Sequence, residues 1–191
     1  MAQVTIPEEG RTLNDPDEIR AFLKPLGIWY EKWDVEGRVG SKATNEEILE
    51  AYRPEVERLK QQGGYQTADV IAVSPATPGL DEMCSKFAKE HTHNEDEVRF
   101  TIQGSGLFQI HPAQGPIFGI TVESGDLINV PAGTRHWFNL CQDKTIRCIR
   151  LFLNPAGWAP HYVADPVHEE FPPVCWGPDY LPRAQDIDPV V

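Results

Sequence analysis

The residues with the clearest chemical potential are histidines and a carboxylate near the middle of the chain. His91 and His93 lie two positions apart, and so do Glu97 and Arg99. Side chains at this spacing on a β-strand point to the same side. Residues 94–96, Asn-Glu-Asp, are polar residues of the kind that reverse the chain. If the chain turns there, His91, His93 and Glu97 converge on one point.

A fourth candidate, His136, follows a Pro-Ala-Gly turn at residues 131–133, so a later strand can bring it to the same place. Three neutral imidazoles and one carboxylate, without a thiolate, suit Fe(II), Ni(II) or Mn(II) and do not point to a closed structural zinc site. In octahedral coordination four protein ligands leave two positions open. If these are adjacent, a substrate with two neighbouring oxygens can chelate the ion. The sequence therefore predicts a substrate-accessible metal site that holds one ion per chain.

The overall composition limits the partners of this chain. Its 191 residues fit a single domain, and 17 basic against 29 acidic residues give a formal net charge of −12. This charge repels nucleic acid and anionic lipid. A metal site with one carboxylate would carry a charge of about +1 and attract an anionic small molecule. We therefore expect no nucleic-acid partner and no membrane partner.

Several features favour the cytoplasm. The amino terminus has no basic region followed by an apolar one, so no secretory signal is visible. The longest uncharged stretch, 100–122, is broken by Gly and Pro and cannot span a bilayer. The four cysteines show no C-x-x-C spacing, which favours reduced thiols. No coiled-coil pattern is present, and we expect a monomer.

The metal site must be positioned by strands, and the chain supplies them after a helical part. Residues 14–25 and 44–63 carry helix caps followed by apolar residues at helical spacing, with Pro54 dividing or kinking the second helix. Residues 27–33 and 67–73 are strand-like. Short β-type runs separated by Gly and Pro then follow, at 98–103, 107–111, 117–122, 127–130, 136–140 and 145–153.

This pattern predicts a mainly β fold, a small barrel or sandwich. We expect one domain, in which 1–66 is a helical amino-terminal part and 67–153 is the metal-binding barrel. Eight of the 17 prolines fall in 154–191, so this tail is expected to be irregular and packed on the barrel.

The spacing of these motifs resembles that of the cupin family, whose double-stranded β-helix barrel (jelly roll) holds a metal between two motifs. The resemblance is carried by His91-x-His93-x3-Glu97 followed by Gly104, and by Gly125-x5-Pro131-x-Gly133-x2-His136. A wider pattern is similar to the acireductone dioxygenase family, cupin enzymes of methionine salvage. This pattern comprises Lys86-Phe87-x-x-Glu90-His91-x-His93-x3-Glu97-Val98-Arg99-Phe100 and Val130-Pro131-Ala132-Gly133-Thr134-x-His136-Trp137-Phe138.

The second resemblance implies a substrate, a chemistry and roles for individual residues. The substrate would be 1,2-dihydroxy-3-keto-5-methylthiopentene, bound as a dianion and cleaved with O2 under Fe(II) or Ni(II). The implied metal ligands are His91, His93, Glu97 and His136.

Arg99 is expected to stabilise the dianion, although a salt bridge to an acidic neighbour is an alternative. Glu90 is expected to orient a ligand histidine or to accept a proton, with a surface carboxylate as the alternative. Phe87, Phe138 and Trp158 are expected to contact the methylthio tail, or else to fill the core.

Two other functions remain open at this point. The scaffold could serve another metal-dependent cupin enzyme, acting on oxalate or a sugar phosphate, because fold alone does not fix function. It could also be a non-catalytic cupin that acts as a binding or sensing module. The joint presence of Phe87, Glu90 and Arg99 favours the dioxygenase.

Overall fold

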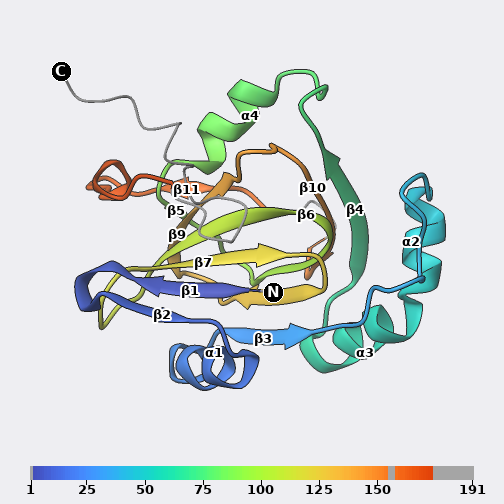
Figure 1. Cartoon of the computed structure of the whole chain (residues 1–191), viewed down its shortest axis with the longest axis horizontal. Helices are drawn as coiled ribbons and strands as arrows, with labels where there is room; N and C mark the ends of the chain where they lie inside the picture. Colours follow the sequence, from blue (N-terminus) through green and yellow to red (C-terminus); the bar gives the residue numbers. More distant parts are fainter. Residues whose placement is uncertain (1, 155–157, 174–191) are drawn as a thin grey trace, which may run out of the picture.

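The computed structural model describes residues 2–154 and 158–173, which form mainly antiparallel β-structure with short helices on its outside. The strands are β1 (Gln3–Ile6), β2 (Arg11–Leu13), β3 (Trp29–Lys32), β4 (Thr67–Val73), β5 (His91–Thr92), β6 (Glu97–His111), β7 (Phe118–Glu123), β8 (Asp126–Val130), β9 (Arg135–Leu140), β10 (Ile146–Phe152) and β11 (His161–Tyr162). The helices are α1 (Pro16–Leu23), α2 (Asn45–Ala51), α3 (Arg53–Gly63) and α4 (Leu80–Phe87), with 3-10 turns η1 (Pro7–Glu9), η2 (Lys24–Leu26) and η3 (His168–Glu170). Figure 1 shows the strands gathered between α4 at one end and α1 with α3 at the other. The prediction of a mainly β fold is confirmed.

The long strand β6 joins the two halves of the sheet. Its first half pairs with β8 and β10, and its second half pairs with β7 and β9. The partners change at Gly104, which has a φ of +77° and lies so close to Thr145 that a Cβ would stand 1.9 Å from its carbonyl oxygen. The prediction of separate strands at 98–103 and 107–111 is wrong, because this glycine bends the strand without ending it.

The amino-terminal part contains strands as well as the expected helices. β3 confirms the strand expected at 27–33 and pairs with β8, whereas β1 and β2 were not expected and extend the sheet beyond β7. The description of 1–66 as a helical part is therefore incomplete. Short strands at an edge of a sheet gain their stability from pairing with distant residues, which local sequence does not reveal.

The helices follow their local signals. Asp15 caps α1 by accepting hydrogen bonds from two backbone amides of its first turn. Thr44 and Glu47 form the capping box of α2, and the helix predicted for 44–63 is divided before α3, which carries Pro54 in its first turn. A proline is tolerated there because the first amides of a helix have no intrahelical partner.

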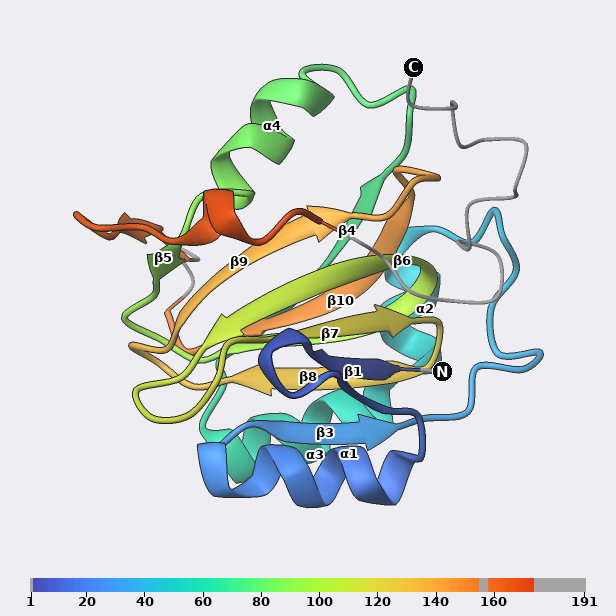
Figure 2. The ribbon, with the colours of Figure 1, turned by 60° about the vertical axis from the view of Figure 1, so that its left-hand side comes forward.

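The helix α4 was not predicted. Its apolar residues Leu80, Met83, Cys84 and Phe87 have the i, i+3, i+4, i+7 spacing of one helical face. Leu80 is buried in a core cluster, and the other three pack against the same cluster. Figure 2 shows α4 beyond β5 and β9, at the end of the molecule opposite α1. The spacing of these apolar residues could have predicted the helix. It was missed because the preceding Pro78-Gly79 turn favoured an irregular chain.

The predicted carboxy-terminal tail, 154–191, is only partly described. Residues 158–173 contain β11, which pairs with β5, and η3, while 155–157 and 174–191 lie outside the described residues. Within the described residues, no helix has the length and apolar character needed to cross a membrane.

Cys84 and Cys148 are free thiols, as expected. Cys141 is disulfide-bonded, so the expectation of reduced thiols is wrong at this position.

Candidate metal centre

The four residues expected to bind a metal come together in one buried cluster. One donor atom from each of His91, His93, Glu97 and His136 can be chosen so that all four lie within 4.8 Å of one another. Each residue is at most 7% exposed. Buried imidazoles around a carboxylate, at this spacing, fit a divalent ion with nitrogen and oxygen ligands. The donor set and its geometry support a site for one metal ion.

Sheet pairing explains why the histidines meet. β5 pairs with β9 so that His91 lies directly opposite His136. The turn before β9 is tied to the histidine pair, because the amide of Gly133 donates to the carbonyl of His93 at 2.9 Å. The same turn is held by Asp96, whose carboxylate accepts from the amide of Ala132. The predicted reversal at 94–96 and the Pro-Ala-Gly turn therefore hold each other in place.

Each histidine is oriented by a backbone carbonyl. The Nδ1 atoms of His91, His93 and His136 lie 2.6, 3.0 and 2.8 Å from the carbonyl oxygens of Lys89, Ala159 and Thr134. A carbonyl only accepts, so these contacts place a proton on Nδ1 and turn Nε2 toward the cluster, where its unprotonated form can bind a metal. Such contacts fix both the tautomer and the ring orientation of a ligand histidine.

The two carboxylate oxygens of Glu97 have different partners. Oε1 accepts from Nε of Arg99 at 2.5 Å, while Oε2 lies 3.0 Å from Nε2 of both His93 and His136. Burial alone would raise the pKa of Glu97, but the charge of Arg99 and the hydrogen bonds from the imidazoles hold it well below its usual value. Glu97 is therefore ionised and offers a single oxygen to the cluster.

The histidines differ in their electrostatic environment. Burial, together with the neighbouring imidazole of His136, lowers the pKa of His91 to about 4, so its ring is neutral and ready to act as a ligand. Burial also acts to lower the pKa of His93, but the hydrogen bond and charge of Glu97 outweigh it and the pKa is raised. The carboxylate thus compensates for the desolvation of the imidazole that it touches.

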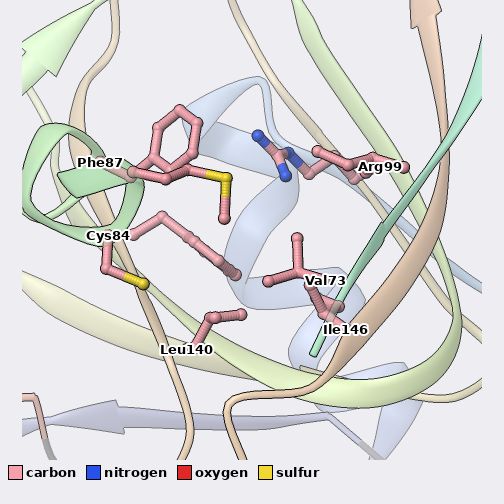
Figure 3. Close-up of a pocket in the computed structure, with 9 residues that line it drawn as sticks. Val73, Cys84, Phe87, Arg99, Leu140 and Ile146 are labelled. Carbon is pink, nitrogen blue, oxygen red and sulfur yellow. The ribbon is translucent and has the colours of Figure 1, made fainter. Parts of the chain in front are cut away.

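A narrow apolar cavity adjoins Arg99, as Figure 3 shows. Its lining comes from four strands and α4: Ile71, Val73, Met83, Cys84, Phe87, Arg99, Phe138, Leu140 and Ile146. In Figure 3 the guanidinium of Arg99 and the ring of Phe87 extend over the same space. Sequence reasoning found Phe87 and Phe138 but missed the other apolar residues of this lining. The helical spacing of Met83, Cys84 and Phe87 was the signal for those on α4.

Trp158 packs against Arg99 but is not among the residues that line the cavity. Its ring centroid is 5.3 Å from the guanidinium carbon of Arg99, and the ring also packs against Phe152 and His93 at centroid distances of 4.6 and 5.9 Å. Arg99 is thus buried and packed against Trp158 and also against Phe138 of the cavity lining, whose ring centroid is 5.4 Å from its guanidinium carbon. A guanidinium held against aromatic faces keeps its orientation.

Glu90 is buried next to His91 but points to other partners. Its Oε1 lies 2.7 Å from Nδ1 of His111 and 2.8 Å from Nε of Arg135, and its Oε2 accepts from the amide of Val167 at 2.8 Å. Among the described residues, the three metal-site histidines find their orienting partners elsewhere. The alternative of an exposed carboxylate is excluded, since the Glu90 side chain is 0% exposed.

Comparisons with known proteins agree with this site. The model of the ARD/ARD' family matches residues 8–160. An acireductone dioxygenase from Marinobacter nauticus is 44% identical over 87% of this chain and 89% of its own length, and one from Aquifex aeolicus is 39% identical over 85% and 88%.

A solved structure gives the same result in three dimensions. The acireductone dioxygenase from Bacillus anthracis with a cadmium ion in its active centre superposes with a TM-score of 0.78, at 37% identity, covering 85% of this chain and 98% of that one. The expected cupin barrel is confirmed by this match together with the metal-site cluster. This chain belongs to the acireductone dioxygenase family of metal-dependent dioxygenases.

Proposed function

We propose that this protein cleaves 1,2-dihydroxy-3-keto-5-methylthiopentene with O2 in methionine salvage. Under Fe(II) the expected products are 4-methylthio-2-oxobutanoate and formate, and under Ni(II) they are 3-methylthiopropanoate, formate and carbon monoxide. The observation that carries the proposal is the buried cluster of three histidines and Glu97 beside a buried arginine and an apolar cavity. This combination suits a small anion with an apolar tail.

The proposed ligands are His91, His93, Glu97 and His136. An ion held by them would supply Lewis acidity and a template for two neighbouring oxygens. The protein itself orients the imidazoles through carbonyl contacts and supplies a carboxylate that is already ionised. Because the four side chains are buried, bulk water is kept from the reacting atoms.

Arg99 is proposed to bind the anionic oxygens of the substrate. It is 6% exposed, its pKa is raised by the charge of Glu97 against the effect of burial, and its Nε is committed to that carboxylate. The contacts with Glu97 and with the thiol of Cys148 hold the group in place, and the remaining N–H groups of the guanidinium are proposed to donate to an enolate oxygen. The salt bridge considered from the sequence thus accompanies the proposed role and does not replace it.

The methylthio tail is proposed to enter the cavity between α4 and β10. Phe87 and Phe138 are the aromatic residues of its lining. Val73, Leu140 and Ile146 add aliphatic side chains. Trp158, which does not line the cavity, is proposed to support Arg99 by packing against it. The cavity therefore sets which tails the substrate can carry.

The decisive experiment is aerobic turnover of the acireductone by protein reconstituted separately with Fe(II) and with Ni(II). We expect O2 consumption in both forms, with carbon monoxide released only by the Ni(II) form. Absence of turnover in both forms, with one ion bound per chain, would contradict the proposal. Turnover of oxalate or a sugar phosphate in its place would support another cupin enzyme.

A matched pair of variants tests where the tail lies. Ile146→Val removes one methylene from the cavity lining, and Ile120→Val removes one from the buried core elsewhere. We expect Ile146→Val to raise kcat/KM for the ethylthio homologue, relative to the methylthio substrate, by about tenfold. Ile120→Val should leave this ratio unchanged. Equal ratios in both variants would place the tail outside this cavity.

The proposal also includes a monomeric, cytoplasmic protein without nucleic-acid or membrane partners. The net charge of −12 and the free thiols of Cys84 and Cys148 support it, whereas the disulfide at Cys141 argues against a reducing compartment. Light scattering after size-exclusion chromatography would measure the mass, and a mass of two chains would refute the monomer.

A further inference from the structure

We propose that Glu90 is a positioning residue that docks the segment 158–167 against the metal cluster. This segment is called the strap below. The inference rests on the proposed function for its effect on turnover, but its structural part can be measured without substrate. It assigns Glu90 a role different from that of a proton acceptor.

The strap lies directly against the ligand histidines. β11 pairs with β5, which places Tyr162 opposite His91. The carbonyl of Ala159 lies 3.0 Å from Nδ1 of His93, and the ring of Trp158 packs on the same histidine at a centroid distance of 5.9 Å. The orientation of His93 therefore depends on where the strap lies, since Ala159 is the residue that fixes its tautomer.

Glu90 holds the other end of the strap. Its Oε2 accepts from the amide of Val167 at 2.8 Å, and its backbone carbonyl accepts from the amide of Val163 at 3.3 Å. Arg135 contacts Oε1 and also donates from Nη2 to the carbonyl of Asp165 at 2.9 Å. Three strap residues are thus bound either to Glu90 or to its arginine partner.

The strap itself has little apolar burial near Glu90, although His168 and Phe171, which follow it, pack against Trp137. Residues 159–162 and 164–166 are exposed, so little apolar burial opposes their release. The Glu90 carboxylate, by contrast, is 0% exposed and has partners on both oxygens. Because a buried carboxylate without partners is costly, the docked strap and the buried Glu90 stabilise each other. Both oxygens are engaged away from the cluster, which leaves Glu90 poorly placed to take a proton from substrate.

The test compares removal of the carboxylate with removal of the group that it binds. Glu90→Ala deletes the acceptor, and Val167→Pro deletes the amide donor while leaving Glu90 in place. Val167→Ala keeps the amide and serves as the control. Hydrogen exchange of peptides covering the strap and titration of the metal-free protein with Ni(II) are measured for all three.

If Glu90 docks the strap, both Glu90→Ala and Val167→Pro should speed exchange in the strap at least about tenfold. Both should also weaken Ni(II) binding by about tenfold to a hundredfold, as expected when a partner of a ligand histidine is lost. Val167→Ala should match the wild type. Exchange in β7 should stay unchanged, which shows that the barrel is folded.

Two results would overturn the inference. One is a strap that stays protected, with wild-type Ni(II) affinity, in Val167→Pro. The other is a Glu90→Ala protein that loses kcat while strap exchange and Ni(II) affinity are unchanged, since this identifies a proton acceptor. If wild-type protein does not turn over the acireductone, the proposed function fails, but the exchange and Ni(II) measurements still decide the role of Glu90. If Glu90→Ala does not fold, Val167→Pro decides alone.

Discussion

At the scale of single residues, the central feature is the shared use of Glu97. One oxygen is bound by Arg99 and the other lies near His93 and His136. The carboxylate is therefore the link between the proposed metal ligands and the proposed substrate-binding arginine. Substitution of a metal ligand and substitution of Arg99 should therefore have different effects on metal content and turnover.

Replacing a ligand histidine should remove the metal. In His93→Ala the cluster loses one of its four donors and Glu97 loses a hydrogen-bond partner. We expect loss of bound metal in Fe(II)- and Ni(II)-reconstituted protein, with turnover lost in both. Metal analysis after desalting measures the first effect, and His161→Ala, which changes an exposed histidine, is the control. A His93→Ala protein with full metal content would contradict the ligand assignment.

Replacing Arg99 should separate binding of metal from turnover. Arg99→Ala leaves Oε2 of Glu97 available to the cluster, so the metal should be retained. Loss of a buried donor to a developing anion typically costs about a hundredfold or more in kcat. Arg99→Lys keeps the charge but not the planar fork, and its activity should be intermediate. Wild-type activity in Arg99→Ala would refute the proposed role.

At the scale of elements, the bend in β6 allows one strand to serve both halves of the sheet. Gly104→Ala would place a Cβ 1.9 Å from the carbonyl oxygen of Thr145 and would force an L side chain into a φ of +77°. We expect a loss of at least about 2 kcal/mol in the free energy of unfolding. Gly115→Ala, at a φ of +97° with no atom within 4 Å of its Cβ, should cost only the backbone strain. Denaturant titration measures both, and equal losses would show that the close contact is unimportant.

The helix α3 is tied to the loop between β3 and α2 by an ion pair between Arg38 and Glu55. The hydrogen bond from Arg38 outweighs burial and lowers the pKa of Glu55 from the ordinary value of 4.5. A lowered pKa in the folded state stabilises the protein above the unfolded value, and this stabilisation is lost as the pH falls through the folded value.

Glu55→Gln should therefore lower the free energy of unfolding by about 1 kcal/mol at neutral pH. The difference from the wild type should shrink as the pH falls below 4.5 and passes through the lowered pKa of Glu55. Thermal or denaturant unfolding across this range measures it, with Glu46→Gln, on the exposed side of α2, as the control. A difference that stays constant with pH would rule out the ion pair as its source.

At the scale of the whole molecule, the sheet links distant parts of the chain. β1 pairs with β7 and β3 pairs with β8, so the amino-terminal part contributes strands to the barrel. The two buried clusters also each combine amino-terminal residues with barrel residues. The single domain expected from the chain length stays a prediction, which unfolding can test.

We therefore expect the metal-free protein to unfold in one cooperative transition. Scanning calorimetry should give a van't Hoff enthalpy equal to the calorimetric enthalpy. The amino-terminal part and the barrel should also lose their structure together when followed by hydrogen exchange. Two separated transitions would show that residues 1–66 form an independent unit.

The sequence by itself determined the donor set and much of the secondary structure. The residue types and spacing of His91, His93, Glu97 and His136 were sufficient because a strand has a fixed side-chain period of two. The helix caps at Asp15 and Thr44 could also be recognised in the sequence, because a cap depends on only a few neighbouring residues. The turn at 131–133 was likewise a local signal.

Only the tertiary structure decided which groups surround these donors. Glu90 meets the amide of Val167 across 77 residues, and His93 meets the carbonyl of Ala159 across 66. The continuity of β6 through Gly104 likewise depended on strands that come later in the chain. Such contacts form because sheet pairing brings distant segments together, and their free energy depends on burial and partners that no local pattern encodes.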